Sequence, residues 1–374
     1  MKEISTVDII APGRGDIVVS VDTHKEQHVG VALDGLGARV GEISIPANAA
    51  GYAQLLTWNG TLGDVGIFAV KGTGSYGSGL ARFLRRNGQR VAEVSRPARK
   101  GERRLLGKRD AIDAEHAARE VLTGKKLSTP KWADGIVEAI RLIKIARDSA
   151  VRAHSQAMIT LKAVLVTADD ELRAALEPLS DVRLVLACSE LAGEAGTDTP
   201  TSASRYGLRA LVCRGLALHE EIKSHSAHLR RLMKAAAPDL VAAFGIGPDI
   251  AAEMLVTAGD NAERLRSEAA LAKLCGACPI PAGSGKTNGR HRLNRGGNRQ
   301  ANAALYRAVI VRMRWHPPTI AYVECHRAPK CGQSWALQNR PVRRGRNGAV
   351  SWPLRSSQSA AAGVRACGGS APAT

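Results

Sequence analysis

The chain has 374 residues, of which 44% are hydrophobic and only 3% aromatic, so its cores must be built mainly from Ala, Leu, Val and Ile. A formal net charge of +19 predicts a polyanionic partner, with DNA or RNA the first choice and an anionic membrane surface the alternative. We find no apolar run of about 18 residues and no cleavable signal pattern, so we expect neither a membrane span nor secretion.

The first 130 residues predict a mixed α/β domain. Residues 1–15 are polar and loop-like, and three β-branched segments joined by short turns then indicate an antiparallel meander. The turn from Gly72 to Ser75 is expected to end in a helix N-cap. The expected strands are 17–22, 28–34, 39–45, 65–70 and 90–94, and the expected helices are 49–58, 76–87 and 110–122. Strands first, then alternating strands and helices, are typical of an α/β fold.

The remaining chain is predicted to be mainly helical. Helices are expected at 134–166, 205–235, 244–258, 268–275 and 299–314, with a loop or linker at 189–204. The spacing in 205–235 fits a helical hairpin or coiled coil as well as one layer of a simple bundle. Residues 244–258 resemble the second half of a helix-hairpin-helix, whose turn amides can hold a phosphate. An ordinary packing corner explains them equally well.

Three aspartates form a candidate metal site. Asp22 ends the first predicted strand, and Asp110 and Asp113 lie three apart at the start of a predicted helix, hence on one face of it. Oxygen ligands of this kind suit Mg²⁺, which can activate a hydroxyl and stabilise a leaving oxygen in phosphate chemistry. Aspartates at a helix start are also common as simple caps.

Two basic stretches flank candidate catalytic motifs. Residues 82–109 hold eleven Lys and Arg against two Glu, and residues 286–314 hold eight against no acid. Two such stretches favour phosphate contacts over a merely solvated face. The nucleic-acid-binding candidates are Arg85, Arg86, Arg99, Lys100, Arg103, Arg104, Lys108, Arg109, Lys286, Arg290, Arg292, Arg295 and Arg299.

Cysteine usage points to a reducing cytoplasm, because seven cysteines do not indicate a disulfide framework. Cys275 and Cys278 form a lone C-x-x-C with no second ligand pair at regular spacing, so small buried or free thiols are favoured over zinc. Ser284 lies in AGSGKT, where Ile280 replaces the first glycine of a P-loop. Two interpretations of this segment therefore stay open: a plain turn or a phosphate-binding loop.

The segments VSVDTHKEQHVGVALD, GTGSYGSGLARFLRRNG, EVSRPARK and GKRDAIDAEHAAREVL resemble, in this order, the N-terminal domain of insertion-sequence-110 family transposases. The segment LCGACPIPAGSGKTNGRHRLNRGGNRQANAALYRAVIVRMR resembles the second transposase domain of that family. The resemblance covers roughly residues 16–325 and implies a ribonuclease-H-like (RuvC-like) fold for the first domain. By resemblance, four DEDD positions match Asp22, residue 71, Asp110 and Asp113, and the nucleophilic serine matches Ser284.

The resemblance divides the chain into a RuvC-like domain (16–130), a helical or coiled-coil linker (131–238), a mainly α second transposase domain (239–325) and a basic tail (326–374). It implies a DNA transposase with Mg²⁺ as cofactor, DNA ends, target DNA and a bridge RNA as partners, and a dimer or tetramer. We expect it in the bacterial cytoplasm, at the nucleoid.

The sequence departs from the family at two places. Lys71 stands where the family has glutamate, which replaces an anionic ligand by an ammonium and should oppose Mg²⁺. Residues 327–374 contain no acid and no helical period, as in a shifted reading frame or a disordered basic tail. Three hypotheses follow: a transposase, an inactive nucleic-acid-binding remnant of the family, and a junction nuclease, against which the Ser284 segment argues.

Overall fold

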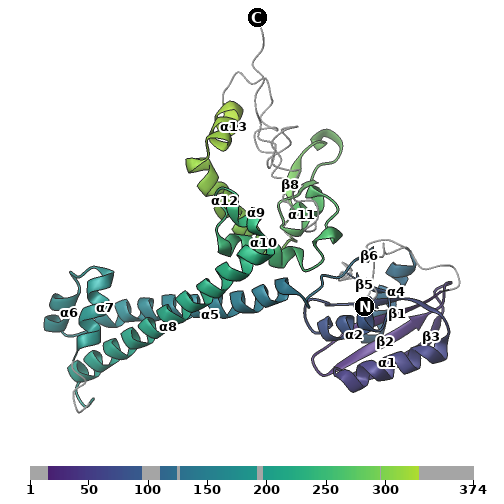
Figure 1. Cartoon of the computed structure of the whole chain (residues 1–374), viewed down its shortest axis with the longest axis horizontal. Coiled ribbons are helices and arrows are strands. Elements are labelled where there is room, and N and C mark those ends of the chain that lie inside the picture. Colours follow the sequence, from purple (N-terminus) through teal and green to yellow (C-terminus); the bar gives the residue numbers. More distant parts are fainter. Residues whose placement is uncertain (1–15, 95–109, 124–126, 192–196, 295, 328–374) are drawn as a thin grey trace, which may run out of the picture. The chain divides into compact units, whose positions relative to one another are not determined.

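The computed structural model describes residues 16–94, 110–123, 127–191, 197–294 and 296–327 (Figure 1). The described chain forms two compact units. One contains the residues up to Gly135 together with Ala258–Leu271, and the other contains Ile136–Thr257 and the residues from Ala272 onward. Among the described helices, none combines the length and apolar character that crossing a membrane requires.

The first unit is built on a six-stranded sheet in the order β3-β2-β1-β4-β5-β6. β1, β2 and β3 pair antiparallel, β4 and β5 continue parallel to β1, and β6 is antiparallel to β5. The meander expected from the sequence is thus confirmed, whereas the two-residue β6 was not predicted. The strands are β1 (Ile17–Thr23), β2 (Gln27–Leu33), β3 (Arg39–Pro46), β4 (Val65–Val70), β5 (Val91–Val94) and β6 (Leu127–Ser128).

Helices cover both faces of this sheet, which explains why β1 and β4 are apolar on both sides. Helices α1 (Ala49–Leu62) and α2 (Ser78–Arg86) bury Leu55 and Leu80 against a cluster that includes Val19. Helix α4 (Asp110–Leu122) packs on the opposite face, in a cluster that includes Val18. Alternate residues of β1 therefore serve two separate cores, as the period of a strand requires.

Helix α4 approaches the sheet through small side chains, in keeping with a chain poor in aromatics. Ala114, Ala117 and Ala118 are almost fully buried there, together with Val121. Its last residue, Leu122, lies next to Gly37 in the β2–β3 turn. Because that turn follows Leu33, which pairs with Val18 at the start of β1, α4 runs antiparallel to β1.

The second unit contains a helical hairpin. The long helices α5 (Ile136–Val166) and α8 (Pro200–Ala236) run side by side (Figure 1). The end of α5 and the start of α8 share one core with two short helices, α6 (Asp170–Leu176) and α7 (Asp181–Glu190). Of the two possibilities left open by the sequence, the structure has the hairpin, and α6 and α7 were not predicted.

The predicted loop at 189–204 was too long at its C-terminal end. Thr199 caps α8 by accepting a hydrogen bond from the Ser202 amide, and Pro200 occupies the first helical position. Proline at that position costs no hydrogen bond and has a φ angle suited to a helix. Ser, Thr and Pro here begin a helix rather than extend a loop.

The rest of the described chain is a set of short elements: α9 (Pro238–Ala242), α10 (Pro248–Ala258), α11 (Glu268–Leu274), β7 (Pro279–Pro281), β8 (His291–Leu293), α12 (Arg299–Trp315) and α13 (Pro317–Arg327). Helix α13 continues through Arg327, two residues beyond the predicted domain limit at 325. The β7–β8 hairpin was not predicted, since its strands contain proline and exposed arginine rather than an alternating apolar pattern.

One segment beyond the hairpin of helices belongs to the first unit. Asn261 accepts a hydrogen bond from the Trp132 amide (2.9 Å) and donates one to the Pro130 carbonyl (3.0 Å). Asp260 accepts from the Gly135 amide at 3.1 Å. Asn261 is almost fully buried. Residues 258–271 are therefore fixed to the strand-based unit by side-chain-to-backbone bonds.

Candidate active site

Asp22 lies near the end of β1 and is only 3% exposed. It shares its face of the strand with Ser20 and Val18, because side chains on one face recur every second residue. Val18 belongs to the cluster that packs against α4. The carboxylate of Asp22 therefore belongs to the α4 side of the sheet, at the end where β1 leaves it.

Lys71 compensates the charge of Asp22. It follows β4 directly, and its Nζ lies 3.0 Å from Oδ1 and 3.1 Å from Oδ2 of Asp22. A second cationic candidate, His24, has its Nε2 3.8 Å from Oδ2 of Asp22. At 3.0 Å and an effective dielectric of 20, two opposite unit charges attract by about 5 kcal/mol. A buried carboxylate thus has an ion-pair partner supplied by the protein itself.

The turn after β4 holds the backbone of Lys71 in place. The Lys71 amide donates to the Val21 carbonyl (3.1 Å), and the Lys71 carbonyl accepts from the Thr23 hydroxyl (2.7 Å). Gly72 has φ 67°, and a Cβ on Gly77 would lie 2.7 Å from the Lys71 carbonyl oxygen. The glycines are therefore needed for the path of the chain past Asp22.

This turn also corrects the predicted N-cap. Helix α2 begins at Ser78 with Gly77 as its N-cap and no side-chain cap. The hydroxyl of Ser75 instead donates to the Gly72 carbonyl (3.2 Å), inside the turn.

Asp110 and Asp113 occupy the first turn of α4, and their side chains lie outside the described part of the structure. Since α4 runs antiparallel to β1, its first turn is at the end of the sheet where Asp22 lies. Positions 110 and 113 also continue the three- and four-residue spacing of the buried positions 114, 117 and 121. Among the described residues, no cluster of three His, Cys, Asp or Glu is close enough to hold a metal ion.

Ser284 lies in the second unit, in the loop between β7 and β8, where its side chain is exposed. Its amide donates to the Thr287 hydroxyl (3.1 Å), and that hydroxyl donates to the Ser284 carbonyl (2.9 Å). A Cβ on Gly283 would clash with the Thr287 carbonyl oxygen. The loop thus fixes the backbone of Ser284 while it presents the hydroxyl to solvent.

The cationic candidates differ in what they contact. Arg85 pairs with Asp134 and stacks 4.2 Å over the Trp132 ring, and burial lowers its pKa, so its charge already has partners. Arg86, Arg290, Arg292 and Arg299 are exposed. Arg99, Lys100, Arg103, Arg104, Lys108, Arg109 and Arg295 lie outside the described residues, as does the side chain of Lys286.

The two remaining sequence motifs, the turn before α10 and the Cys275–Cys278 pair, contribute to the packing of the second unit. In the turn before α10, Gly245 (φ 74°) lies against α12, and the Phe244 carbonyl accepts from the Arg312 Nε at 2.9 Å, as in a packing corner. Cys275 is buried, and burial raises its pKa to about 11, so it is a protonated thiol at neutral pH. Cys278 is partly exposed, and both thiols are free.

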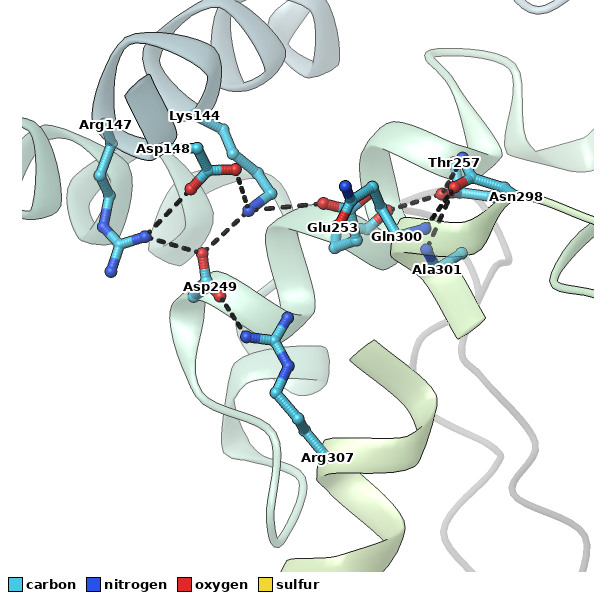
Figure 2. A network of polar contacts seen from close by, with 10 residues as sticks. All are labelled: Lys144, Arg147, Asp148, Asp249, Glu253, Thr257, Asn298, Gln300, Ala301 and Arg307. Carbon is cyan, nitrogen blue, oxygen red and sulfur yellow. Dashed lines mark hydrogen bonds and ion pairs between the residues drawn. The ribbon is translucent and has the colours of Figure 1, made fainter. Parts of the chain in front are cut away.

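Sequence reasoning missed a partly buried charge network in the second unit (Figure 2). Lys144 of α5 is nearly buried, and its Nζ lies 2.9 Å from Asp249, 3.0 Å from Asp148 and 3.4 Å from Glu253. Arg147 and Arg307 also pair with Asp249, at 3.0 and 3.3 Å. The network therefore joins α5 to α10 and α12.

The pKa values in the network shift towards the charged forms. Burial lowers the pKa of Lys144, but hydrogen bonds to Asp249 and Asp148 outweigh it and raise the pKa overall. Burial raises the pKa of Asp249, but the bond to Lys144 and the nearby cations lower it overall. The sequence contained one signal of this network: Lys144 lies four residues after Ile140 and therefore on the apolar face of α5.

Comparisons with known proteins match two parts of the chain. A profile described as a transposase and defined on the DEDD transposases of IS110 matches residues 19–168. The profile of the transposase IS116/IS110/IS902 family matches residues 237–324. A Streptomyces coelicolor protein, the insertion element IS110 uncharacterized 43.6 kDa protein, is 32% identical over 114 residues, which are 30% of this chain and 28% of that protein.

Proposed function

Since the chain belongs to the IS110 family of transposases, we propose that it binds the DNA of an insertion sequence and catalyses strand cleavage and exchange. The main observation in support of the proposal is that Asp22, near the end of β1, and the first turn of α4, which contains Asp110 and Asp113, lie at the same end of the sheet. The strand order and directions of β1 to β5 support a ribonuclease-H-like fold for this unit.

Ser284 is the proposed nucleophile. Its oxygen would attack the phosphorus of a phosphodiester and form a serine–phosphate ester with one strand end. The bond from phosphorus to the oxygen of the other strand end breaks, and the proton of the serine hydroxyl passes to that oxygen, which leaves as a free hydroxyl. The fixed backbone and exposed side chain in the β7–β8 loop support this role. The exposed Arg290 and Arg292 on the same hairpin are suited to bind the phosphates of the strand.

The residues present do not fit a divalent cation at Asp22. An ammonium already binds both oxygens of that carboxylate, and a dication would have to displace it or be repelled by it. The residues described at Asp22 therefore do not hold Mg²⁺, and we propose that the activity of this protein is impaired. The Lys71–Asp22 pair specifically favours the second candidate, an inactive nucleic-acid-binding remnant of the family.

DNA ends, target DNA, a bridge RNA and a homo-oligomer remain proposals that follow from the family. The domain limits at residues 130, 238 and 325, and a position at the nucleoid, likewise remain predictions. The net charge of +19 supports a nucleic-acid partner of either kind.

The experiment is recombination of an intact element in cells, together with trapping of a covalent protein–DNA adduct. We expect weak activity for the wild type, increased activity for Lys71→Glu and none for Ser284→Ala or the double variant. Adducts that persist in Ser284→Ala would refute the role of this serine. Salt-dependent binding of DNA and RNA without cleavage by either the wild type or Lys71→Glu would select the remnant.

A further inference from the structure

The second unit contains a long stretch without any acidic residue. Residues 269–323 include nine Lys and Arg and no Asp or Glu. This stretch contains the β7–β8 hairpin and the whole of α12. The stretch therefore contributes only positive charge to this part of the unit, which favours anions as ligands.

One side of α12 is used for packing and the other is open. Ala301, Ala304 and Ala308 are buried, whereas Tyr306 on the opposite side is 65% exposed. Arg299 and Met313 are exposed and lie seven residues before and after Tyr306, so the three form one line along the helix. Arg314 is exposed beside this line. We call Arg299, Tyr306, Met313 and Arg314 the Tyr306 face.

The cations of α12 fall into two classes. Arg307 pairs with Asp249 at 3.3 Å, and Arg312 donates to the Phe244 carbonyl at 2.9 Å, so both contribute to packing of the unit. Arg299 and Arg314 of the Tyr306 face have no ion-pair partner among the residues that the structure describes. The face thus combines a largely exposed aromatic ring with two uncompensated charges.

The positive charge of the chain indicates which kind of ligand can bind to the Tyr306 face. A second copy in a symmetric contact would bring Arg299 and Arg314 against the same positive charges. The chain's own residues 328–374 contain no acid and are basic as well. A polyanion is the complementary partner, and an exposed ring adds stacking energy only where bases are unpaired.

We propose that the Tyr306 face binds a single-stranded nucleic acid, with a base stacked on Tyr306 and phosphates on Arg299 and Arg314. The inference rests on the proposed function only in that both require nucleic-acid binding. It adds a contact that distinguishes unpaired strands from duplexes. DNA and RNA share the chemistry involved, and the experiment separates them.

The experiment measures binding of the full chain to fluorescent single strands of about 16 nucleotides, as DNA and as RNA, and to a duplex of the same length. Tyr306→Ala should weaken single-strand binding by about 5- to 150-fold, the equivalent of about 1–3 kcal/mol, and leave duplex binding unchanged. Tyr306→Phe should retain the affinity, because it keeps the ring. The strand type that loses affinity identifies the ligand.

Trp315→Ala is the matched control, because Trp315 is 71% exposed on the same helix but nine residues from Tyr306, on the opposite side. Equal losses for Trp315→Ala and Tyr306→Ala, equal losses for single strands and duplexes, or no loss would overturn the proposal. So would a change of oligomeric state on sedimentation of Tyr306→Ala. Wild-type protein that binds duplexes but no single strand would refute this inference alone, and protein that binds neither would refute the proposed function too.

Discussion

Replacement of Lys71 by glutamate tests whether this residue keeps a metal ion away from Asp22. The attraction of about 5 kcal/mol between the two groups at 3.0 Å would become a repulsion of similar size if neither group moved. Lys71 is 19% exposed, so a glutamate can turn partly to solvent, and we expect the metal-free variant to lose about 3–5 kcal/mol of stability.

A divalent cation should restore part of this loss in the variant only. At a Mn²⁺ concentration about 100 times its dissociation constant, binding stabilises the folded protein by about 2.7 kcal/mol, or roughly 5–10 °C in Tm. The assay is thermal unfolding with and without Mn²⁺, followed by strand cleavage under the same conditions. The wild type should show no such increase in Tm.

Lys71→Met is the control for this experiment. It removes the ion pair but adds no ligand, so it should be destabilised without being restored by Mn²⁺. An increase in Tm of equal size in the wild type, or in Lys71→Met, would refute the reasoning, because the metal would then bind independently of residue 71.

Two further predictions concern stability. Lys144→Met should lower the free energy of unfolding by about 3–5 kcal/mol, because it removes the cation paired with Glu253, whose side chain is only 10% exposed, while Asp249 keeps Arg147 and Arg307. Lys162→Met at the exposed pair with Asp181 should cost under about 1 kcal/mol in the same denaturant titration, and equal costs would contradict this. Burial lowers the pKa of His28 below 6.5, so as the pH falls the imidazole is protonated in the unfolded chain before it is protonated in the folded chain. The contribution of His28 to stability is therefore complete above pH 6.5. It decreases as the pH falls from there, by at most about 1.4 kcal/mol per pH unit. His28→Phe, which can still pack on Tyr52, should have a shallower pH dependence of unfolding, and an unchanged slope would show that other groups cause it.

Local patterns predicted the elements whose cores are local. The strand 65–70 and the helix 110–122 have the same limits in the structure, because an apolar run and an Ala-rich periodicity each define a buried surface. The strands that were missed carry no strand pattern of their own. β6 has two residues and exists because it pairs with the distant β5. The β7–β8 hairpin is local, but it pairs residues such as Ile280 and Arg292 that do not alternate between apolar and polar.

The candidate site was predicted only as a list of residues. The resemblance supplied Asp22, Asp110, Asp113 and Ser284, but the contact of Lys71 with both oxygens of Asp22 required coordinates. Lys144 and Asp249 are 105 residues apart, and no periodicity relates them. Arg85 was grouped with the phosphate-binding cations because its contacts with Asp134 and Trp132 cannot be recognised from the sequence.

The bonds of Asn261 and Asp260 to the backbone at residues 130–135 determine how this protein can be divided. The polypeptide passes from the first unit to the second, returns at Ala258 and leaves again after Leu271. A stop codon, a proteolytic cut or a domain exchange placed between residues 136 and 257 would separate the sheet from a segment bonded to it. Recombinant fragments or chimaeras of the strand-based unit would therefore need two non-contiguous pieces of the gene.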